Sequence, residues 1–180
     1  MKRIKIICLA FVTLTLFPSV GLSQSSETTD ETRNKSIKAA REIMNLANTC
    51  ALITIDDKGI PRVRTMDPFP PENDFTVWFG TNNKSRKVEQ IKNNPKVTLY
   101  YLDNDDSGYV TIHGIAQIVN DELEKEKRWK DEWKAFYKNK TNDYVLIKVS
   151  PKWMEVISYT RGIVSNTATW EPPVVNFDLK

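Results

Sequence analysis

The feature that most constrains the fold of this sequence is a series of short β-rich segments joined by tight turns. Residues 50–55 (CALITI) and 61–66 (PRVRTM) flank Asp57-Lys58-Gly59, a pattern typical of a β-hairpin. Because parallel strands need long crossover connections, these short turns favour an antiparallel arrangement. The sequence therefore predicts a mainly β fold with flanking helices, in which a small barrel has helices packed outside it. Further strands are predicted at residues 75–79, 97–102, 109–119, 144–149 and 153–158, the last two as one strand or a pair.

Three helices are predicted around these strands. The first follows Ser36, a plausible N-cap, and has apolar residues at helical spacing at Ile37, Ala40, Ile43, Met44, Leu46 and Ala47. The second covers residues 85–93 and stops before Pro95. A long charged helix is predicted over residues 121–138, with one face formed by Trp129, Trp133, Phe136 and Tyr137. Such an aromatic face is typical of core packing rather than of a cofactor site.

The N-terminal residues have the pattern of a secretory signal peptide. A basic start is followed by an apolar run at residues 6–17 and by small residues up to Ser23, where cleavage is expected. The run is shorter than the roughly 20 residues of a membrane span. Residues 24–34 (QSSETTDETRN) are polar and predict a flexible linker, which leaves residues 35–180 as the folded domain.

Removing this leader changes the charge and the cysteine content. The chain has 26 basic and 23 acidic residues, and the leader contains three basic and no acidic ones, so 23 of each sign remain. A neutral mature chain gives no electrostatic reason to expect nucleic-acid or membrane binding. Cys50 then stands alone and cannot form an internal disulfide. We expect a periplasmic or secreted bacterial protein.

Most motifs of known catalytic chemistry are missing from the sequence. It has no Gly-rich dinucleotide turn, no phosphate loop and no nucleophile elbow. His113 is the only histidine, so a zinc site of several histidines is excluded and no metal site is predicted. Its place in the middle of a strand favours a hydrogen-bonded structural role.

Two segments do suggest a binding site. Strand alternation places Arg62, Arg64 and Met66 on one face of residues 61–66. Residues 81–87 (TNNKSRK) begin a helix, where free backbone N–H groups, a hydroxyl and cations together suit a phosphate monoester. Guanidinium groups of the strand would complete such a site. The alternative is a capped basic helix start beside a polar strand.

At these segments the sequence resembles the pyridoxamine 5'-phosphate oxidase-like FMN-binding split-barrel family, in particular its general stress protein branch. The resemblance is carried by WFGTNNKSRKVEQIKNNPKVTLYY (residues 78–101), GIPRVRTMDPF (59–69) and HGIAQIV (113–119), and it extends over residues 37–162. It implies a six-stranded, Greek-key-like split barrel that forms an obligate homodimer. It also implies FMN bound at the dimer interface.

The resemblance also implies which residues hold the flavin. Arg62 and Arg64 would flank the strand along the flavin, and the ring would be lined by Val63, Arg64, Thr65 and Met66. The ring edge and ribityl chain would be contacted by Trp78, Phe79 and Thr81, and the phosphate held by Ser85, Arg86 and Lys87. Tyr159 and Arg161 of the partner subunit would complete the site.

The sequence also departs from this family. Its oxidases bind their vitamin substrate with an Arg-x-His pair near the C-terminus, which a chain with His113 alone cannot form. Oxidation of pyridoxamine phosphate is therefore not expected. Two hypotheses remain: an FMN-dependent oxidoreductase, or a non-enzymatic exported homodimer that binds flavin, haem or another small ligand. The arginine and lysine residues favour a phosphorylated ligand. Trp170 would form a lid over the pocket or pack onto the barrel.

Overall fold

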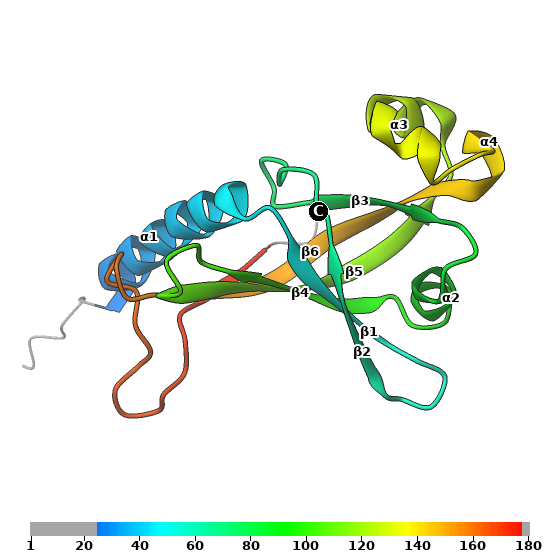
Figure 1. Ribbon diagram of the computed structural model, residues 1–180. Helices are drawn as coiled ribbons and strands as arrows, with labels where there is room; N and C mark the ends of the chain where they lie inside the picture. The colour runs from blue at the N-terminus through cyan, green and yellow to red at the C-terminus, as the bar shows by residue number, and fades with distance from the viewer. Residues whose placement is uncertain (1–24, 178–180) are drawn as a thin grey trace, which may run out of the picture.

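The computed structural model describes residues 25–177, so the predicted leader lies outside the described residues. Its centre is one curved antiparallel sheet with the strand order β2-β1-β4-β5-β6-β3, and β7 pairs with β6 outside this path (Figure 1). The predicted mainly β fold with flanking helices is confirmed. The sheet has seven strands rather than the six that the resemblance implies, because β7 near the C-terminus pairs with β6 outside the six-strand path. The strands are β1 (Cys50–Ile55), β2 (Pro61–Met66), β3 (Val77–Asn82), β4 (Lys96–Leu102), β5 (Gly108–Val119), β6 (Tyr144–Ser158) and β7 (Val174–Asn176).

The helices lie around this sheet. One long helix, α1, packs on the inner face of the sheet, α2 lies beside the β1–β2 hairpin, and the short helices lie over the far ends of β3 and β6 (Figure 1). Among the described residues, no helix is long and apolar enough to cross a membrane. The helices are α1 (Ser25–Leu46), α2 (Arg86–Asn93), α3 (Glu122–Lys127), the 3-10 helix η1 (Asp131–Ala135) and α4 (Lys140–Asp143).

The first helix begins earlier than the sequence predicts. It starts at Ser25, so it replaces nearly all of the linker expected over residues 24–34, and Ser36 is an interior residue rather than an N-cap. Residues 30–35 stay exposed, whereas Ser36, Ala40, Ile43 and others form the buried face that packs on the sheet. Once this packing has fixed the helix, each further residue adds a hydrogen bond without a new nucleation cost. The polar residues before Ser36 can therefore extend the helix toward its N-terminus.

The long helix expected over residues 121–138 is broken into two short helices, α3 and η1, and α4 follows after it. The break occurs at residues 128–130, where Lys130 is extended, because Trp129, Trp133 and Tyr137 pack inward around Tyr144 on the outer side of β3 and β6. Phe136, which the sequence places on the same face, is instead 75% exposed. Trp133 covers Gly80, where an added Cβ would lie 2.4 Å from the indole ring. The buried Lys125 ammonium ties the segment together through the side chains of Asn120 and Glu122 and the carbonyl of Thr141.

Two strand boundaries also differ from the sequence-based expectation. The third strand begins at Val77 rather than Phe75, because Phe75 has a φ of 64° and cannot be extended there. Residues 144–158 form the single strand β6 instead of a pair, and its pairing with β5 absorbs a register shift after His113. The main core lies between α1 and the inner sheet face, so no other part of residues 25–177 covers the outer face of β1, β4 and β5.

Candidate functional site

The β1–β2 hairpin directs two arginines toward α2. Its register pairs Thr54 with Arg62 and Leu52 with Arg64, and Leu52 is fully buried in the core. Arg62, Arg64 and Met66 therefore lie on the inner face of β2, as strand alternation predicts. Since α2 packs against β1, this face meets the first turns of the helix.

Arg64 is held by two uncharged side chains. Its Nη1 donates to Thr54 Oγ1 at 2.7 Å, and its Nη2 donates to Gln90 Oε1 at 3.0 Å. The Thr54 hydroxyl in turn donates to Gln90 Oε1 at 2.6 Å. The guanidinium is thus fixed in direction, but these contacts leave its charge uncompensated.

The start of α2 brings a hydroxyl pair and an ammonium group to the same place. Lys87 Nζ donates to Thr81 Oγ1 at 3.1 Å, and Thr81 Oγ1 lies 3.3 Å from Ser85 Oγ. Ser85 occupies the N-cap position, but its side chain makes no capping hydrogen bond. The first N–H groups of a helix have no partners within the helix, so this end of α2 offers donors to an anion.

Arg62, Arg64, Arg86 and Lys87 form what we name the cation cluster. Burial lowers the pKa of Arg64, and the charges of Arg86 and Arg62 lower it further. Burial likewise lowers the pKa of Lys87, with Arg64 adding to the effect. Within residues 25–177, only Arg62 of this cluster forms an ion pair, with Asp56. The other three members, Arg64, Arg86 and Lys87, place positive charges that repel one another at one helix start. Such a group of cations favours binding of a multiply charged anion.

The surface beside the cation cluster is open and polar. A pocket of about 360 Å³ lies between the hairpin and α2 and includes Arg62 and Arg86 in its wall. A ligand whose anionic group binds at the helix start would therefore remain accessible from solvent. The rest of the wall is formed by Asp56, Asp57, Lys58, Glu89, Gln90 and Asn93.

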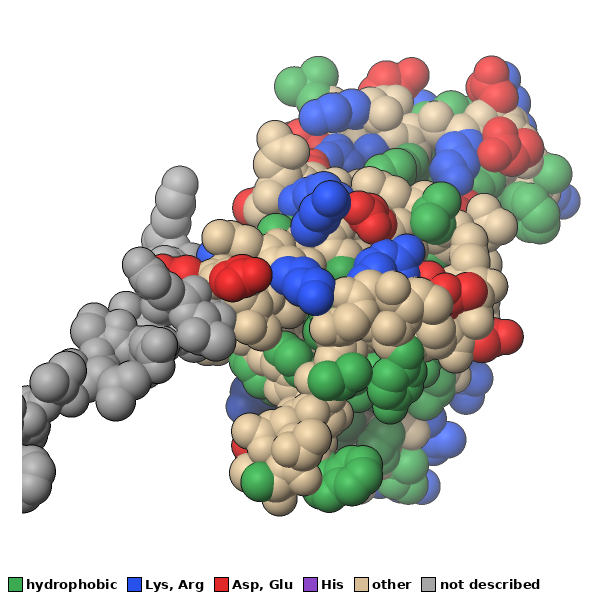
Figure 2. Space-filling model, turned by 90° about the vertical axis from the view of Figure 1, so that its left-hand side faces the viewer, with side chains coloured by type: hydrophobic (Ala, Val, Ile, Leu, Met, Phe, Trp, Pro, Cys, Tyr) green, Lys and Arg blue, Asp and Glu red, His purple; other side chains and the backbone are tan. Residues whose placement is uncertain are grey.

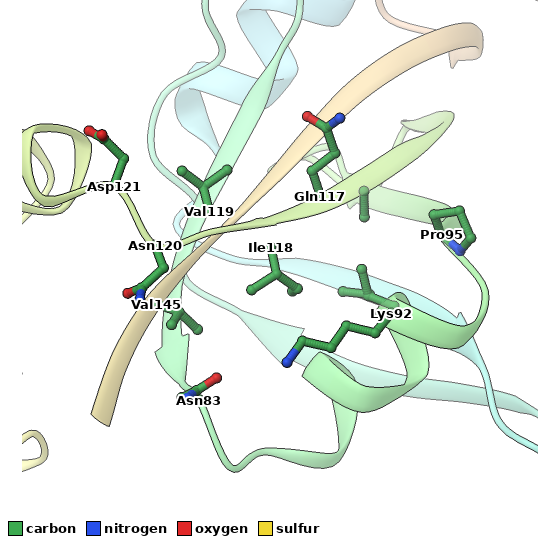
Figure 3. A pocket seen from close by; sticks show the side chains of 11 residues that line it. Asn83, Lys92, Pro95, Gln117, Ile118, Val119, Asn120, Asp121 and Val145 are labelled. Carbon is green, nitrogen blue, oxygen red and sulfur yellow. The ribbon is translucent and has the colours of Figure 1, made fainter. Parts of the chain in front are cut away.

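A second groove lies on the other side of α2 and does not include the cation cluster. It has a volume of about 890 Å³, and Figure 3 shows Lys92 and Asn83 at its mouth with Ile118 on its floor. Its floor is apolar and its rim is mainly amide and charged side chains. The sequence did not predict this groove, because residues of α2, β5 and β6 line it together.

The expected flavin-contacting residues of β2 and β3 point in different directions. Val63 and Thr65 lie on the outer face of β2, opposite Arg64 and Met66, and Val63 is 66% exposed. In β3, Phe79 is in the main core, and only Thr81 reaches the cation cluster.

Trp78 lies on the opposite face of β3, away from Thr81. Arg128 stacks on its ring at 3.8 Å, and its Nε1 donates to Glu72. The structure therefore brings Arg62, Arg64, Thr81, Ser85, Arg86 and Lys87 together and leaves Trp78 and Phe79 out of this group.

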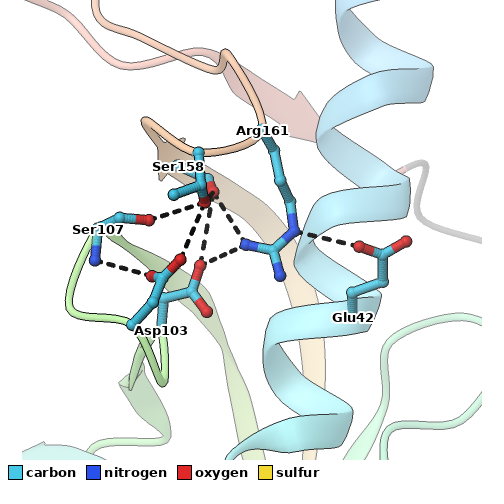
Figure 4. Close-up of polar contacts among 7 residues, drawn as sticks. Glu42, Asp103, Ser107, Ser158 and Arg161 are labelled. Atoms are coloured by element: carbon cyan, nitrogen blue, oxygen red, sulfur yellow. Dashed lines mark hydrogen bonds and ion pairs between the residues drawn. The ribbon is translucent and has the colours of Figure 1, made fainter.

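Tyr159 and Arg161 lie at the other end of the molecule. Arg161 joins α1 to the end of β4 through ion pairs with Glu42 at 3.1 Å and with the buried Asp103 (Figure 4). Tyr159 is 69% exposed. One chain alone does not place either residue beside the cation cluster. Trp170 is 81% exposed at a φ of 62°, so it does not pack onto the barrel.

The outer sheet face is apolar and aromatic. A cross-strand row runs from Val63 through Ile53, Thr98 and His113 to Trp153. The His113 ring stacks on Trp153 with centroids 3.6 Å apart, and its Nδ1 lies 3.0 Å from the Thr98 hydroxyl. Burial lowers the pKa of His113, although Glu155 opposes this shift.

Metal and thiol chemistry have little support in the described part of the chain. No group of three histidine, cysteine or acidic side chains is placed there to hold a metal ion. Cys50 is buried, and its burial raises the pKa of the thiol to about 12. This thiol therefore stays protonated at neutral pH.

Sequence analysis missed two residues of the site, Thr54 and Gln90. Gln90 lies one helical turn after Arg86, so the i, i+4 spacing was available as a signal. Thr54 lies opposite Arg62 in the hairpin register, which a short two-strand pattern also indicates. Neither pattern predicts that both side chains meet Arg64.

The fold and the cation cluster together define an antiparallel barrel protein with a cationic site between a hairpin and a helix start. The family model described as Pyridoxamine 5'-phosphate oxidase like matches residues 35–167. The chain belongs to this family.

Individual relatives agree with this assignment. General stress protein 26 of Bacillus subtilis (strain 168) is 28% identical over 99 residues, which are 53% of this chain and 69% of the relative. Pyridoxine/pyridoxamine 5'-phosphate oxidase of Bradyrhizobium sp. (strain BTAi1 / ATCC BAA-1182) is 30% identical over 110 residues, 61% of this chain. The match covers only 50% of the Bradyrhizobium protein.

A solved structure supports the fold. The crystal structure of general stress protein 26 from Bacillus anthracis str. Sterne superimposes with a TM-score of 0.57 and is 28% identical. The match covers 69% of this chain and 92% of that structure. The expected split-barrel fold and the resemblance to the general stress protein branch are both confirmed.

Proposed function

We propose that this protein binds FMN and acts as a flavin-dependent oxidoreductase. The observation that carries the proposal is that Lys87 donates to Thr81 beside Ser85, and that the charge of Arg64 acts on Lys87 and that of Arg86 on Arg64. Among residues 25–177, no carboxylate forms an ion pair with Arg64, Arg86 or Lys87. A phosphate monoester supplies the two negative charges and the acceptor oxygens that this arrangement lacks.

The remaining part of the cofactor would lie along the hairpin. Ser85, Arg86, Lys87 and Arg64 would hold the phosphate, and the ring would lie on β2 with Thr81 near the ribityl chain. The flavin would supply the electron transfer, while these side chains bind and orient it. Because a second histidine is absent from the sequence, pyridoxamine phosphate is not the proposed substrate.

A second copy of the chain would cover the outer sheet face. The row of Ile53, His113 and Trp153 leaves apolar and aromatic side chains partly exposed, and such residues are enriched in stable interfaces. The end of the molecule with Tyr159 is also apolar, and Figure 2 shows hydrophobic side chains gathered below a band of charged ones there. We propose a homodimer in which the partner's Tyr159 lies near the flavin.

Export is part of the same proposal. The leader pattern of residues 1–23 would direct the chain to the bacterial periplasm or the medium. Mass spectrometry of the protein from the periplasmic fraction should give a mature N-terminus at Gln24. An intact Met1 in all cellular fractions would contradict export.

The flavin proposal is tested by absorbance and by fluorescence titration with FMN. The purified protein should show flavin bands or quench FMN fluorescence, and the double variant Arg86→Ala/Lys87→Ala should lose this binding while it stays folded. The matched control Lys84→Ala/Lys92→Ala removes two exposed cations of the same region and should bind FMN normally. Equal FMN affinity in wild type and the first double variant would refute the phosphate assignment.

A further inference from the structure

Arg64 is the partly buried member of the cation cluster, and its hydrogen bonds are unusual. Both of its observed acceptors, Thr54 Oγ1 and Gln90 Oε1, are neutral. Buried or half-buried arginines ordinarily have a carboxylate partner, because an unpaired charge is costly to remove from water. Here the neighbouring charges are those of Arg62 and Arg86, which are also positive.

The acceptor pair is itself rigid. Thr54 is fully buried in β1, and its hydroxyl donates to the same Gln90 oxygen that receives Arg64, at 2.6 Å. The three side chains therefore close a ring of hydrogen bonds between β1, β2 and α2. This ring fixes the direction of the guanidinium without neutralising it.

We propose that Thr54 and Gln90 are positioning residues that hold Arg64 charged and aimed for a phosphate group. A carboxylate at either position would satisfy the same N–H groups but would compete with the phosphate for the cation. Neutral acceptors avoid this competition, and the like-charge repulsion of the cluster is released when the anion binds. The proposal rests on the proposed flavin site and assigns a role to two residues outside the predicted set.

The decisive variant is Gln90→Glu. It keeps the size of the side chain and an oxygen at the position of Oε1, but it adds a negative charge about 3 Å from the guanidinium. The affinity for FMN should fall at least tenfold, whereas the affinity for riboflavin, which lacks the phosphate, should stay unchanged. The folded ligand-free protein should be at least as stable as wild type, because Arg64 gains an ion pair.

Two further variants separate positioning from general damage. Thr54→Ser keeps the hydroxyl and should bind FMN like wild type, whereas Thr54→Val removes it and should weaken FMN binding. The matched control Gln117→Glu makes the same substitution on β5, on the other side of α2 from Arg64. It should leave both FMN and riboflavin affinities unchanged.

Inorganic phosphate provides a readout that does not depend on flavin. Thermal unfolding with phosphate or chloride at equal ionic strength should show stabilisation by phosphate in wild type and none in Gln90→Glu. If phosphate stabilises wild type but not Gln90→Glu, and wild type does not bind FMN, the positioning role stands and the flavin function falls. If Gln90→Glu binds FMN as wild type does, the positioning role is refuted and the flavin function stands. If wild type binds neither, both are refuted.

Discussion

Replacing Lys87 with methionine should raise the free energy of unfolding of the ligand-free protein and lower its affinity for FMN. Lys87 is half-buried at the start of α2, and its ammonium donates to Thr81 Oγ1 at 3.1 Å. Burial and the charge of Arg64 lower its pKa below the ordinary value of 10.5, so the folded chain carries this charge at a cost. Methionine keeps most of the apolar stem and removes the charge.

The size of the binding effect follows from the lost charge-assisted hydrogen bond. Such a bond contributes about 1.5–3 kcal/mol, which corresponds to about a 10- to 150-fold rise in the Kd for FMN. Riboflavin should bind equally to both proteins, because the difference lies at the phosphate. Fluorescence titration measures both constants, and an FMN affinity unchanged in Lys87→Met would refute the role of this lysine.

The pH dependence of unfolding provides an independent check with a definite sign. Because the pKa of Lys87 is lower in the folded state, the unfolded chain binds more protons between the two values, and stability rises with pH in that range. Urea unfolding of the ligand-free protein should therefore show wild type gaining stability relative to Lys87→Met as the pH rises toward 10.5. A constant difference between the two proteins would contradict the assigned pKa shift.

The remaining predictions concern the fold and the assembly. Asp103→Ala should lower the free energy of unfolding by about 2–3 kcal/mol, because Asp103 is only 2% exposed and its removal leaves Arg161 with Glu42 as its one remaining ion-pair partner. A loss below about 0.5 kcal/mol in urea denaturation would contradict this. Ile53→Asp should convert a dimer into a folded monomer in sedimentation velocity, whereas Leu123→Asp, on exposed α3, should remain dimeric. A dimeric Ile53→Asp variant would place the interface elsewhere.

The position of Arg161 is relevant to the proposed dimer. Its guanidinium is held by Glu42 and Asp103 of its own chain, so it is already satisfied in the monomer. Tyr159, two residues earlier, has no such constraint and is exposed. If the partner subunit completes the flavin site, we expect its Tyr159 to contact the flavin. Arg161 would instead fix the position of the chain segment that carries Tyr159.

The cation cluster was largely predictable because its parts depend on local geometry. Alternation along residues 61–66 placed Arg62 and Arg64 on one face, and this holds in any strand. Ser85 is the N-cap and Arg86 and Lys87 are the first residues of a short amphipathic helix, and their spacing alone indicates a helix start. The hairpin that joins the first two strands followed from its turn residues in the same way.

The sequence by itself thus determined the approximate positions of β1 to β6, the hairpin and the local order of the binding residues, because each depends on neighbours in the chain. Only the tertiary structure decided which faces are covered. Val77, Trp78 and Phe79 are all buried, so periodicity could not show that Trp78 turns toward Arg128 and away from Lys87. The meeting of Arg64 with Gln90, 26 residues later, depends on how α2 packs against the sheet, and no local pattern encodes that contact.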